Sequence, residues 1–301
     1  MLKVTLEQWR MFRSVAEFGG FNQASQGVYK SQSSIHNAVV KIEQSLGVKL
    51  FHIEGRKTVL TESGEMMLRR ASYLLDEAVK VEAVGTTLGQ GIESQLRIAV
   101  DEIFPQKLLY QVLETTSEKY PLLRIELIES VLTGANELLG NTDVDIAISP
   151  FDLKDVFSEE LCQIEFLAVS HPSHPLQALE RDLTLEDLKS YRQIVVRDSA
   201  ASKKQDEGWL GANQRWTVSN MTTSIEMICD GLGFAWLPLS SIEGALEDGQ
   251  LKPLRLKQGG TRRAQLHLIF NDGDRFGPAA RDFIGELRYR CMNLPSISNL
   301  G

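Results

Sequence analysis

The chain has 301 residues, of which 43% are hydrophobic and 24% are charged, and its formal net charge is -8 at neutral pH. This length and composition predict a globular protein of two or three domains. No stretch offers the run of about 20 apolar residues that spans a bilayer, and the start has no cleavable signal, so we expect a cytoplasmic protein.

Charge is distributed unevenly along the chain. The first 90 residues hold 11 Lys and Arg against 9 Asp and Glu, a balance of +2, whereas the remainder holds 21 against 31, a balance of -10. The acidic total therefore does not prevent the first module from approaching nucleic acid, because the local field of the docking module decides its binding. The cysteines, Cys162, Cys229 and Cys291, are odd in number and far apart, which favours buried thiols over a disulfide framework or a metal site.

Helix start and stop signals predict two helices at the beginning of the chain. Thr5 and Gln8 form a capping-box pair for the first, and Gly19-Gly20 ends it. Asn22 is expected to cap a short second helix that runs to about Val28.

A third helix begins after the short connection "VYK". Ser31 is its expected cap, Gly47 ends it, and its apolar residues recur at the three- and four-residue spacing of an amphipathic helix. Helix, three-residue turn, helix is the helix-turn-helix arrangement, whose second helix enters the major groove by its N-terminal end. The opposite face carries neutral donors and acceptors that suit base edges or phosphates, and that would also suit an ordinary solvated surface: Gln32, Ser33, His36, Asn37 and Lys41.

The stretch "VKLFHIEGRKTVLT" predicts a hairpin after the third helix. Two short strand-like runs flank Glu54-Gly55, and the turn would place Arg56 and Lys57 beside the phosphates as a wing.

The run "FNQASQGVYKSQSSIHNAVVKIEQSLGVKLFHIEGRKTVLTESGEMML" resembles the winged helix-turn-helix of the LysR-type transcriptional regulators. The resemblance rests on "AS" at Ala24-Ser25, "SQSSI" from Ser31, "IEQSLGVKLF" from Ile42 and "LTESGE" from Leu60. It implies a DNA-binding domain over residues 1–62, with Asn22 and Ser31 among its DNA-contacting positions. Asn22 stands where this family usually has Ser, and Ile53 and Glu54 replace the usual Arg and small residue, which bears on wing contacts and base preference.

A long helix is expected over residues 63–90, with a heptad stripe of apolar residues. One reading is a surface helix on its own domain, and the other is pairing with a second chain. The resemblance implies a dimerising linker helix, so that a homodimer or homotetramer reads half-sites related by a two-fold axis. The stripe comprises Met67, Ala71, Leu74, Ala78 and Val81.

Residues 91–301 alternate short strands, rich in Val, Ile and Leu, with helical segments, which is typical of α/β layers with largely parallel sheets. The stretches "VDIAIS", "SHPL" and "DGLGFAWLP" resemble the effector-binding domain of the same family. The resemblance implies two Rossmann-like lobes similar to periplasmic binding proteins. We expect lobe 1 at about 91–161 and 266–293 and lobe 2 at about 162–265, with the last helix packed on lobe 1.

Ligands of such sheets lie at the carboxyl ends of the strands, near helix N-termini. Arg197 is the expected anchor for a carboxylate, while Asp101 and Glu102 would favour a ligand with an amine or hydroxyls over a simple aromatic or dicarboxylic acid. Each candidate also suits a helix cap or a turn. The candidates are Asp101, Glu102, Ser130, Ser149, Arg197, Asp198, Ser219, Asn220 and Thr222.

These features predict a transcription factor whose partners are operator DNA, a small-molecule effector and RNA polymerase. The chain lacks the nucleophile-elbow, phosphate-loop, zinc-protease and paired-cysteine motifs, so we expect no enzyme, cofactor or metal site. The alternative is a cytoplasmic solute-binding protein without specific DNA binding, which the last two hundred residues alone would permit.

Overall fold

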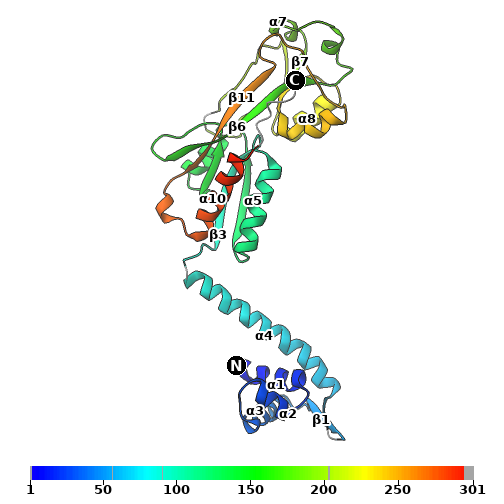
Figure 1. The fold of residues 1–301 in the computed structure, drawn as a ribbon, viewed down its shortest axis with the longest axis vertical. Helices are drawn as coiled ribbons and strands as arrows, with labels where there is room; N and C mark the ends of the chain where they lie inside the picture. Colours follow the sequence, from blue (N-terminus) through cyan, green and yellow to red (C-terminus); the bar gives the residue numbers. More distant parts are fainter. Residues whose placement is uncertain (1, 56, 90, 203, 295–301) are drawn as a thin grey trace. The chain divides into compact units, whose positions relative to one another are not determined.

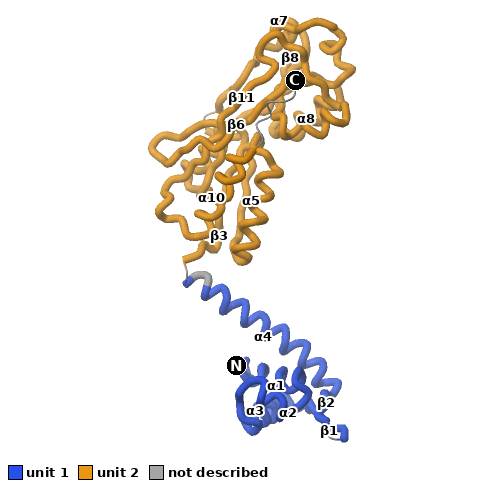
Figure 2. The backbone as a smooth tube through the Cα atoms, in the orientation of Figure 1, with its two compact units in different colours: residues 1–90 blue, residues 91–301 orange. Residues whose placement is uncertain are grey.

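The structure is a computed structural model that describes residues 2–55, 57–89, 91–202 and 204–294. The chain divides into two compact units, residues 1–90 and 91–301 (Figure 2). Among the described residues, no helix has both the length and the apolar character needed to cross a membrane.

The first unit opens with two helices, α1 (Leu6–Phe18) and α2 (Phe21–Gly27). The predicted capping box is confirmed, because the Thr5 hydroxyl accepts from the Gln8 N–H at 3.2 Å and the Gln8 side chain accepts from the Thr5 N–H at 2.8 Å. The prediction that Asn22 caps α2 is wrong. Gly20 is the cap, and Asn22 lies in the first helical turn, because the helix already begins at Phe21, whose ring packs 5.8 Å from that of Phe51.

The third helix, α3 (Gln32–Leu46), begins and ends where the sequence predicts. The Ser31 hydroxyl accepts from the Ser34 N–H at 3.2 Å, and Gly47 ends the helix with φ of 70°. Its apolar stripe, including Ile35 and Ile42, is buried against α1 and α2. The polar face is thereby turned to solvent.

A hairpin and a long helix complete the unit. Strands β1 (Phe51–Glu54) and β2 (Lys57–Leu60) pair antiparallel, as predicted. Helix α4 (Glu62–Gly89) then starts against the end of the α3–β1 connection. Gly64 is required there, because a Cβ atom would lie 2.1 Å from the Leu50 carbonyl oxygen.

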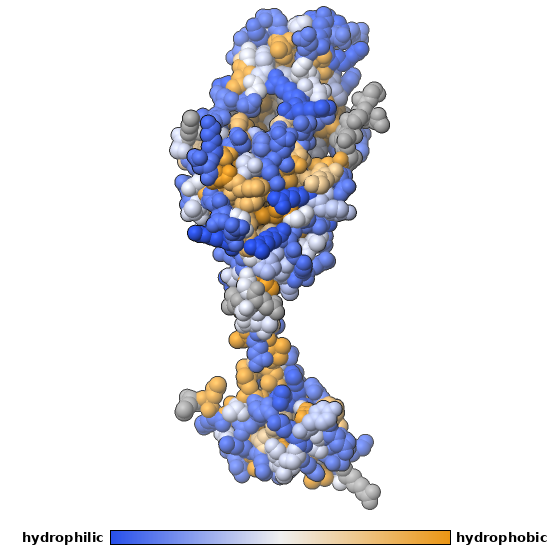
Figure 3. Space-filling model, turned by 60° about the vertical axis from the view of Figure 1, so that its left-hand side comes forward, coloured by the Kyte–Doolittle hydropathy of each residue, from blue (hydrophilic) through white to orange (hydrophobic). Residues whose placement is uncertain are grey.

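The apolar stripe of α4 divides into two parts. Met67 and Ala71 contact the core of their own unit. Ala71 is only 3% exposed, so its assignment to a dimer seam is wrong, whereas Met67 is half-buried and its place in a seam stays a prediction. The first turns of α4 bury these side chains against α1. Beyond them, Leu74 is 45% and Val81 70% exposed, and Figure 3 shows the apolar side chains that α4 presents to solvent.

The second unit is an α/β domain built on one nine-stranded sheet in the described part of the chain (Figure 1). Its strands are β3 (Gln95–Asp101), β4 (Arg124–Ser130), β5 (Ile146–Ser149), β6 (Phe157–Ser170), β7 (Arg192–Val196), β8 (Gln214–Val218), β9 (Phe234–Pro238), β10 (Lys252–Pro253) and β11 (Thr261–Phe270). Its helices are α5 (Gln106–Lys119), α6 (Gly134–Gly140), α7 (Leu185–Leu188), α8 (Met221–Cys229), α9 (Leu239–Glu247) and α10 (Pro278–Met292), with short 3-10 turns at Pro175–Ala178 and Gly273–Arg275.

The strand order is β4-β3-β5-β11-β6-β9-β7-β8, and β10 pairs with β6. The outer groups, β4-β3-β5 and β9-β7-β8, are parallel within themselves. The centre differs from the expected parallel sheet, because β6 and β11 run antiparallel to each other and to their outer neighbours. These two long strands carry the chain from lobe 1 to lobe 2 and back.

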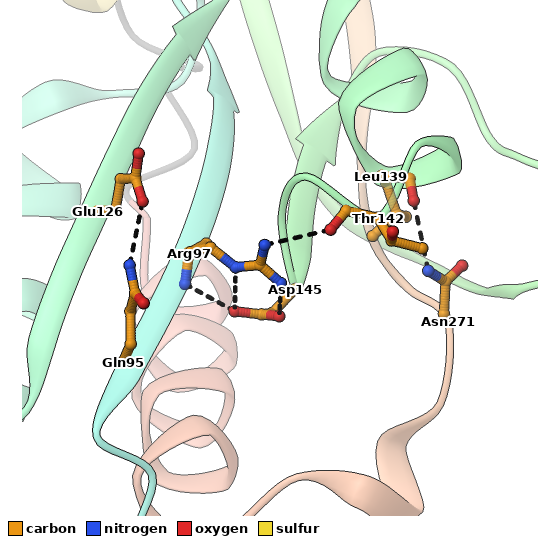
Figure 4. A network of polar contacts seen from close by, with 7 residues as sticks. All are labelled: Gln95, Arg97, Glu126, Leu139, Thr142, Asp145 and Asn271. Carbon is orange, nitrogen blue, oxygen red and sulfur yellow. Dashed lines mark hydrogen bonds and ion pairs between the residues drawn. The ribbon is translucent and has the colours of Figure 1, made fainter.

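Lobe 1 is held in register by a polar network around Arg97 (Figure 4). The Arg97 backbone N–H and guanidinium both donate to Asp145 at 2.8 Å, and the guanidinium also donates to the Thr142 carbonyl at 3.2 Å. This network joins β3 to the start of β5. Because Asp101 pairs with Ser130 in the same register, the carboxyl ends of these strands meet at one edge.

The last helix, α10, packs against α5 and β6 of lobe 1. Glu93 accepts from the Ala279 and Ala280 N–H groups at 3.0 and 3.2 Å and so caps it. None of the cysteines forms a disulfide: Cys291 on α10 is buried, whereas Cys162 and Cys229 are only half-buried.

Glu43 should be a main polar contributor to the stability of the first unit. It is buried at the end of α3 and accepts from the Leu50 N–H at 2.8 Å and from Lys49 at 2.6 Å. We expect Glu43→Gln to lower the free energy of unfolding by about 1 to 3 kcal/mol, since a charged hydrogen bond is lost. Urea denaturation followed by circular dichroism measures this, with the exposed Glu17→Gln as the matched control.

The effect of Glu43 should also depend on pH. Burial raises the pKa of Glu43, but the hydrogen bonds from Lys49 and the Leu50 N–H outweigh burial and hold it below its ordinary value. Its stabilising contribution is therefore present above the pKa of an unfolded glutamate and is lost as the pH falls through the lower, folded value. Equal losses for Glu43→Gln and Glu17→Gln would contradict this role.

Candidate nucleic-acid interface and effector cavity

The polar face of α3 is exposed over its N-terminal half. The Ser31 and Ser33 hydroxyls lie 3.1 Å apart, and the His36 ring lies 5.4 Å from the Phe21 ring, which steadies it from one side. The exposed residues of this face are Gln32, Ser33, His36, Asn37 and Lys41. The helix thus presents amide, hydroxyl, imidazole and ammonium groups together.

The remaining candidates for DNA contact lie around this face. Asn22 is exposed on α2, and Lys57 is exposed at the start of β2, opposite Glu54. Arg56 lies outside the described residues. The sequence did not single out Tyr29, which is 95% exposed with φ of 52° in the turn between α2 and α3. The sequence signal that could have drawn attention to Tyr29 is an aromatic residue beside a lysine in this turn.

The second unit contains a cavity of about 330 Å³ between its lobes. Lobe 1 contributes Asp101, Ile103 and Leu132, and lobe 2 contributes residues of β7, β8, β9, α8 and the loop 206–210. β11, which joins the lobes, contributes Arg262, Arg263 and Ala264. A small molecule bound here would contact both lobes.

Asp101 lines the cavity, but its carboxylate is engaged within lobe 1. It is 1% exposed and accepts from the Ile103 N–H at 3.0 Å and the Leu132 N–H at 2.6 Å. Burial raises the pKa of Asp101 to about 7, against the two backbone donors that favour its charged form.

Glu102 and Asn220 both cap α8 instead of lining the cavity. The Glu102 carboxylate of lobe 1 accepts from the Met221 N–H of lobe 2, and Asn220 accepts from the Thr223 N–H at 2.8 Å. Partial burial raises the pKa of Glu102. Glu102 thus ties the lobes together.

Asp198 makes a second connection between the lobes. It accepts from the Ala200 and Gln205 N–H groups at 2.9 and 2.8 Å and from the Thr133 hydroxyl of lobe 1. Its neighbour Ser199 accepts from the Val131 N–H at 2.9 Å. The segment that follows β7 is therefore hydrogen-bonded directly to lobe 1.

The other predicted strand-end residues are dispersed. The Ser130 hydroxyl is buried without a partner among the described residues, and Ser149 donates to Asn136. Ser219 and Thr222 are exposed and do not line the cavity. Arg197 does line it and is an exposed residue. Of the nine predicted positions, the structure brings only Asp101 and Arg197 to the cavity.

Several lining residues were missed because they do not lie at the carboxyl ends of strands. Gln193 is the second residue of β7, Trp236 is the middle residue of β9, and Arg262 is near the start of β11. Trp209 comes from the loop that follows the inter-lobe segment. Of these residues, only the tryptophans could have been recognised from the sequence as possible ligand contacts, and a tryptophan is equally compatible with the hydrophobic core.

Asp101 should impose a pH dependence on the second unit. The folded pKa of Asp101, about 7, lies above that of an unfolded aspartate. Its contribution to the free energy of unfolding is therefore complete below about pH 4 and is lost as the pH rises through 7. We expect wild type to lose melting temperature relative to Asp101→Asn between these values in calorimetry. The exposed Asp230→Asn should show no such trend, and a constant difference between wild type and Asp101→Asn would contradict the prediction.

Comparison with known proteins gives the same division of the chain. Residues 6–65 match the bacterial regulatory helix-turn-helix protein of the lysR family, and residues 89–292 match the LysR substrate binding domain. The probable HTH-type transcriptional regulator YhaJ of Escherichia coli is 28% identical over 98% of this chain and 97% of its own length. The uncharacterized HTH-type regulator YeeY, also of Escherichia coli, is 29% identical over 83% of this chain and 82% of its own.

A solved structure shows a similar fold over most of the chain. CrgA, a LysR-type transcriptional regulator from Neisseria meningitidis, aligns over 95% of this chain and 99% of its own with a TM-score of 0.55 and 20% identity. The fold, the exposed helix face and the inter-lobe cavity agree with these matches. The chain belongs to the LysR family of transcriptional regulators, with an N-terminal helix-turn-helix domain and a C-terminal effector-binding domain.

Proposed function

We propose that this regulator reads operator DNA with the N-terminal half of α3 and contacts the phosphates through its hairpin. In this proposal residues 1–62 form the DNA-binding domain. Gln32, Ser33 and His36 face the base edges, Asn37 and Lys41 follow along the groove, and Lys57 neutralises a phosphate with Arg56. The observation that carries the proposal is the exposure of every polar α3 candidate on a helix whose opposite side is buried.

The proposed effector site is the cavity between the lobes. Because both lobes line it, a ligand there adds contacts that depend on the arrangement of the lobes, and it shifts the equilibrium by its difference in affinity for each arrangement. The links from Glu102 to α8 and from Asp198 to Thr133 are the contacts that a rearrangement would have to change. Operator binding would respond through the assembled oligomer.

Assembly is proposed to use the exposed part of α4. Leu74 and Val81 expose apolar surface, with Ala78 between them. Met67 and Ala71 pack against the core of their own unit. Two copies of α4 could bury these side chains together, within the 63–90 linker of a homodimer or homotetramer. Dimeric DNA recognition then implies half-sites related by a two-fold axis.

We further propose that the protein acts in the cytoplasm without catalysing a reaction, and that RNA polymerase is its partner at the promoter. The regulators in its family support this role. A solute-binding protein without DNA recognition is disfavoured, because residues 6–65 match a regulatory helix-turn-helix.

Gln32 should determine sequence preference, while Lys57 should contribute affinity alone. We expect Gln32→Ala to lose about 1 to 3 kcal/mol of discrimination at particular base pairs, and Lys57→Ala to weaken all DNA about equally. Gel shifts on operator fragments with single base changes measure both. Gln44→Ala is the matched control, because Gln44 is exposed on the same helix outside the proposed interface. Unchanged affinity and preference in Gln32→Ala would sink the proposed docking.

Leu74 should be required for assembly. Leu74→Glu would bring like charges together in a paired helix, so we expect a shift toward monomers in sedimentation and loss of tight binding to an operator with two half-sites. Leu185→Glu, a leucine of comparable exposure on α7, is the control and should leave the mass unchanged. An unchanged mass for Leu74→Glu would show that α4 does not pair through this residue.

A further inference from the structure

The lobe 2 side of the cavity contains an arginine, Arg262, that forms no ion pair with the described residues. The Arg262 guanidinium lies 4.1 Å from the centre of the Trp236 ring, and the Trp236 indole N–H donates to the Gly259 carbonyl at 2.8 Å. No carboxylate of the described residues lies within 4.0 Å of Arg262, and Glu207 acts on it only at longer range. Burial lowers the pKa of Arg262. A partly desolvated guanidinium held in one orientation is a ready anchor for an anion.

The loop 206–210 is shaped around this arginine. Gly208 has φ of 84°, and a Cβ atom on it would lie 2.7 Å from Nη1 of Arg262. A larger residue would therefore displace the guanidinium. The backbone conformation favours glycine at this position.

A second polar group, Gln193, contacts the same loop. Gln193 is only 3% exposed, and its Nε2 donates to the Trp209 carbonyl at 2.7 Å. Its Oε1 is buried and has no partner among the described residues, although the residue lines the cavity. Leaving such an acceptor unpaired costs about 1 to 3 kcal/mol. A ligand that donates a hydrogen bond would remove this cost.

The two groups contact adjacent residues of the loop 206–210. Arg262 abuts Gly208 and Gln193 is bonded to Trp209, and adjacent residues are about 3.8 Å apart. The cavity wall near them includes the aromatic side chains of Phe166, Trp209 and Trp236. Cation, acceptor and aromatic surface therefore occur together.

We propose that the effector is a small, planar ring acid whose carboxylate binds Arg262 and whose ring hydroxyl or N–H donates to Gln193. This inference rests on the proposed effector role of the cavity and names the chemistry of its ligand. It replaces Arg197 by Arg262 as the anchor. It also removes the reason to require an amine, because both oxygens of Asp101 already accept backbone N–H groups.

The test is calorimetric titration of the full chain with matched probes. The three hydroxybenzoate isomers carry both groups, benzoate lacks the donor, and the hydroxybenzyl alcohols lack the anion. We expect at least one hydroxybenzoate to bind roughly tenfold more tightly than benzoate, and the corresponding alcohol to bind at least tenfold more weakly than its acid.

Two variants assign these preferences to their residues. Gln193→Leu should bind the hydroxybenzoate and benzoate equally, and Arg262→Met should bind the acid and the alcohol equally. If Arg262→Met fails to fold, Arg262→Lys, which keeps the charge, is used in its place. Arg255→Met removes an exposed charge of the same lobe outside the cavity and should keep both preferences.

Two outcomes would overturn the inference. One is the failure of every hydroxybenzoate to bind, and the other is retention of both preferences in Gln193→Leu and Arg262→Met. Neither outcome touches the proposed DNA recognition and assembly, which are judged by operator binding and sedimentation. Failure of the wild-type protein to recognise an operator would instead reject the proposed function and would leave the ligand chemistry intact.

Discussion

The antiparallel pairing of β6 with β11 is the interaction on which the second unit depends. The two strands pair from Phe157 with Phe270 to Leu167 with Thr261, and each contributes to both lobes. Because β5 extends this pair at one end and β9 at the other, both parallel groups take their position from it. The carboxyl ends of the two groups consequently face each other, and the cavity is the space that remains between them.

The polar groups along this edge divide into those that close the lobes and those that face the cavity. Asp101, Glu102 and Asp198 all accept backbone N–H groups. Glu102 does so across the lobes, and Asp198 also accepts from the Thr133 hydroxyl of lobe 1. Buried carboxylates need such donors, since an unpaired charge away from water is very costly. Arg262 forms no ion pair with the described residues, and the buried Gln193 Oε1 has no hydrogen-bond partner among them. Structural and recognition roles are thus distinguished by the partners of each group.

The first unit follows the same division on a smaller scale. Ile35 and Ile42 bury one side of α3, and Glu43 secures its end through Leu50, so the polar side is held outward on a rigid support. Recognition side chains on a fixed helix lose little entropy when they meet DNA. The exposed stripe of α4 is a further feature of this unit that its own core leaves uncovered.

Local features of this protein were determined by the sequence alone. Caps at Thr5 and Ser31, the glycine stops and the apolar periods predicted the helices, because these signals act within one or two turns. The cavity was decided by the tertiary structure. Glu102 meets Met221 across 119 residues, and only that contact shows that its carboxylate is occupied. Arg262 and Gln193 lie within strands, where no local pattern marks them, and they become a site because the sheet and the loop at Gly208 bring them together.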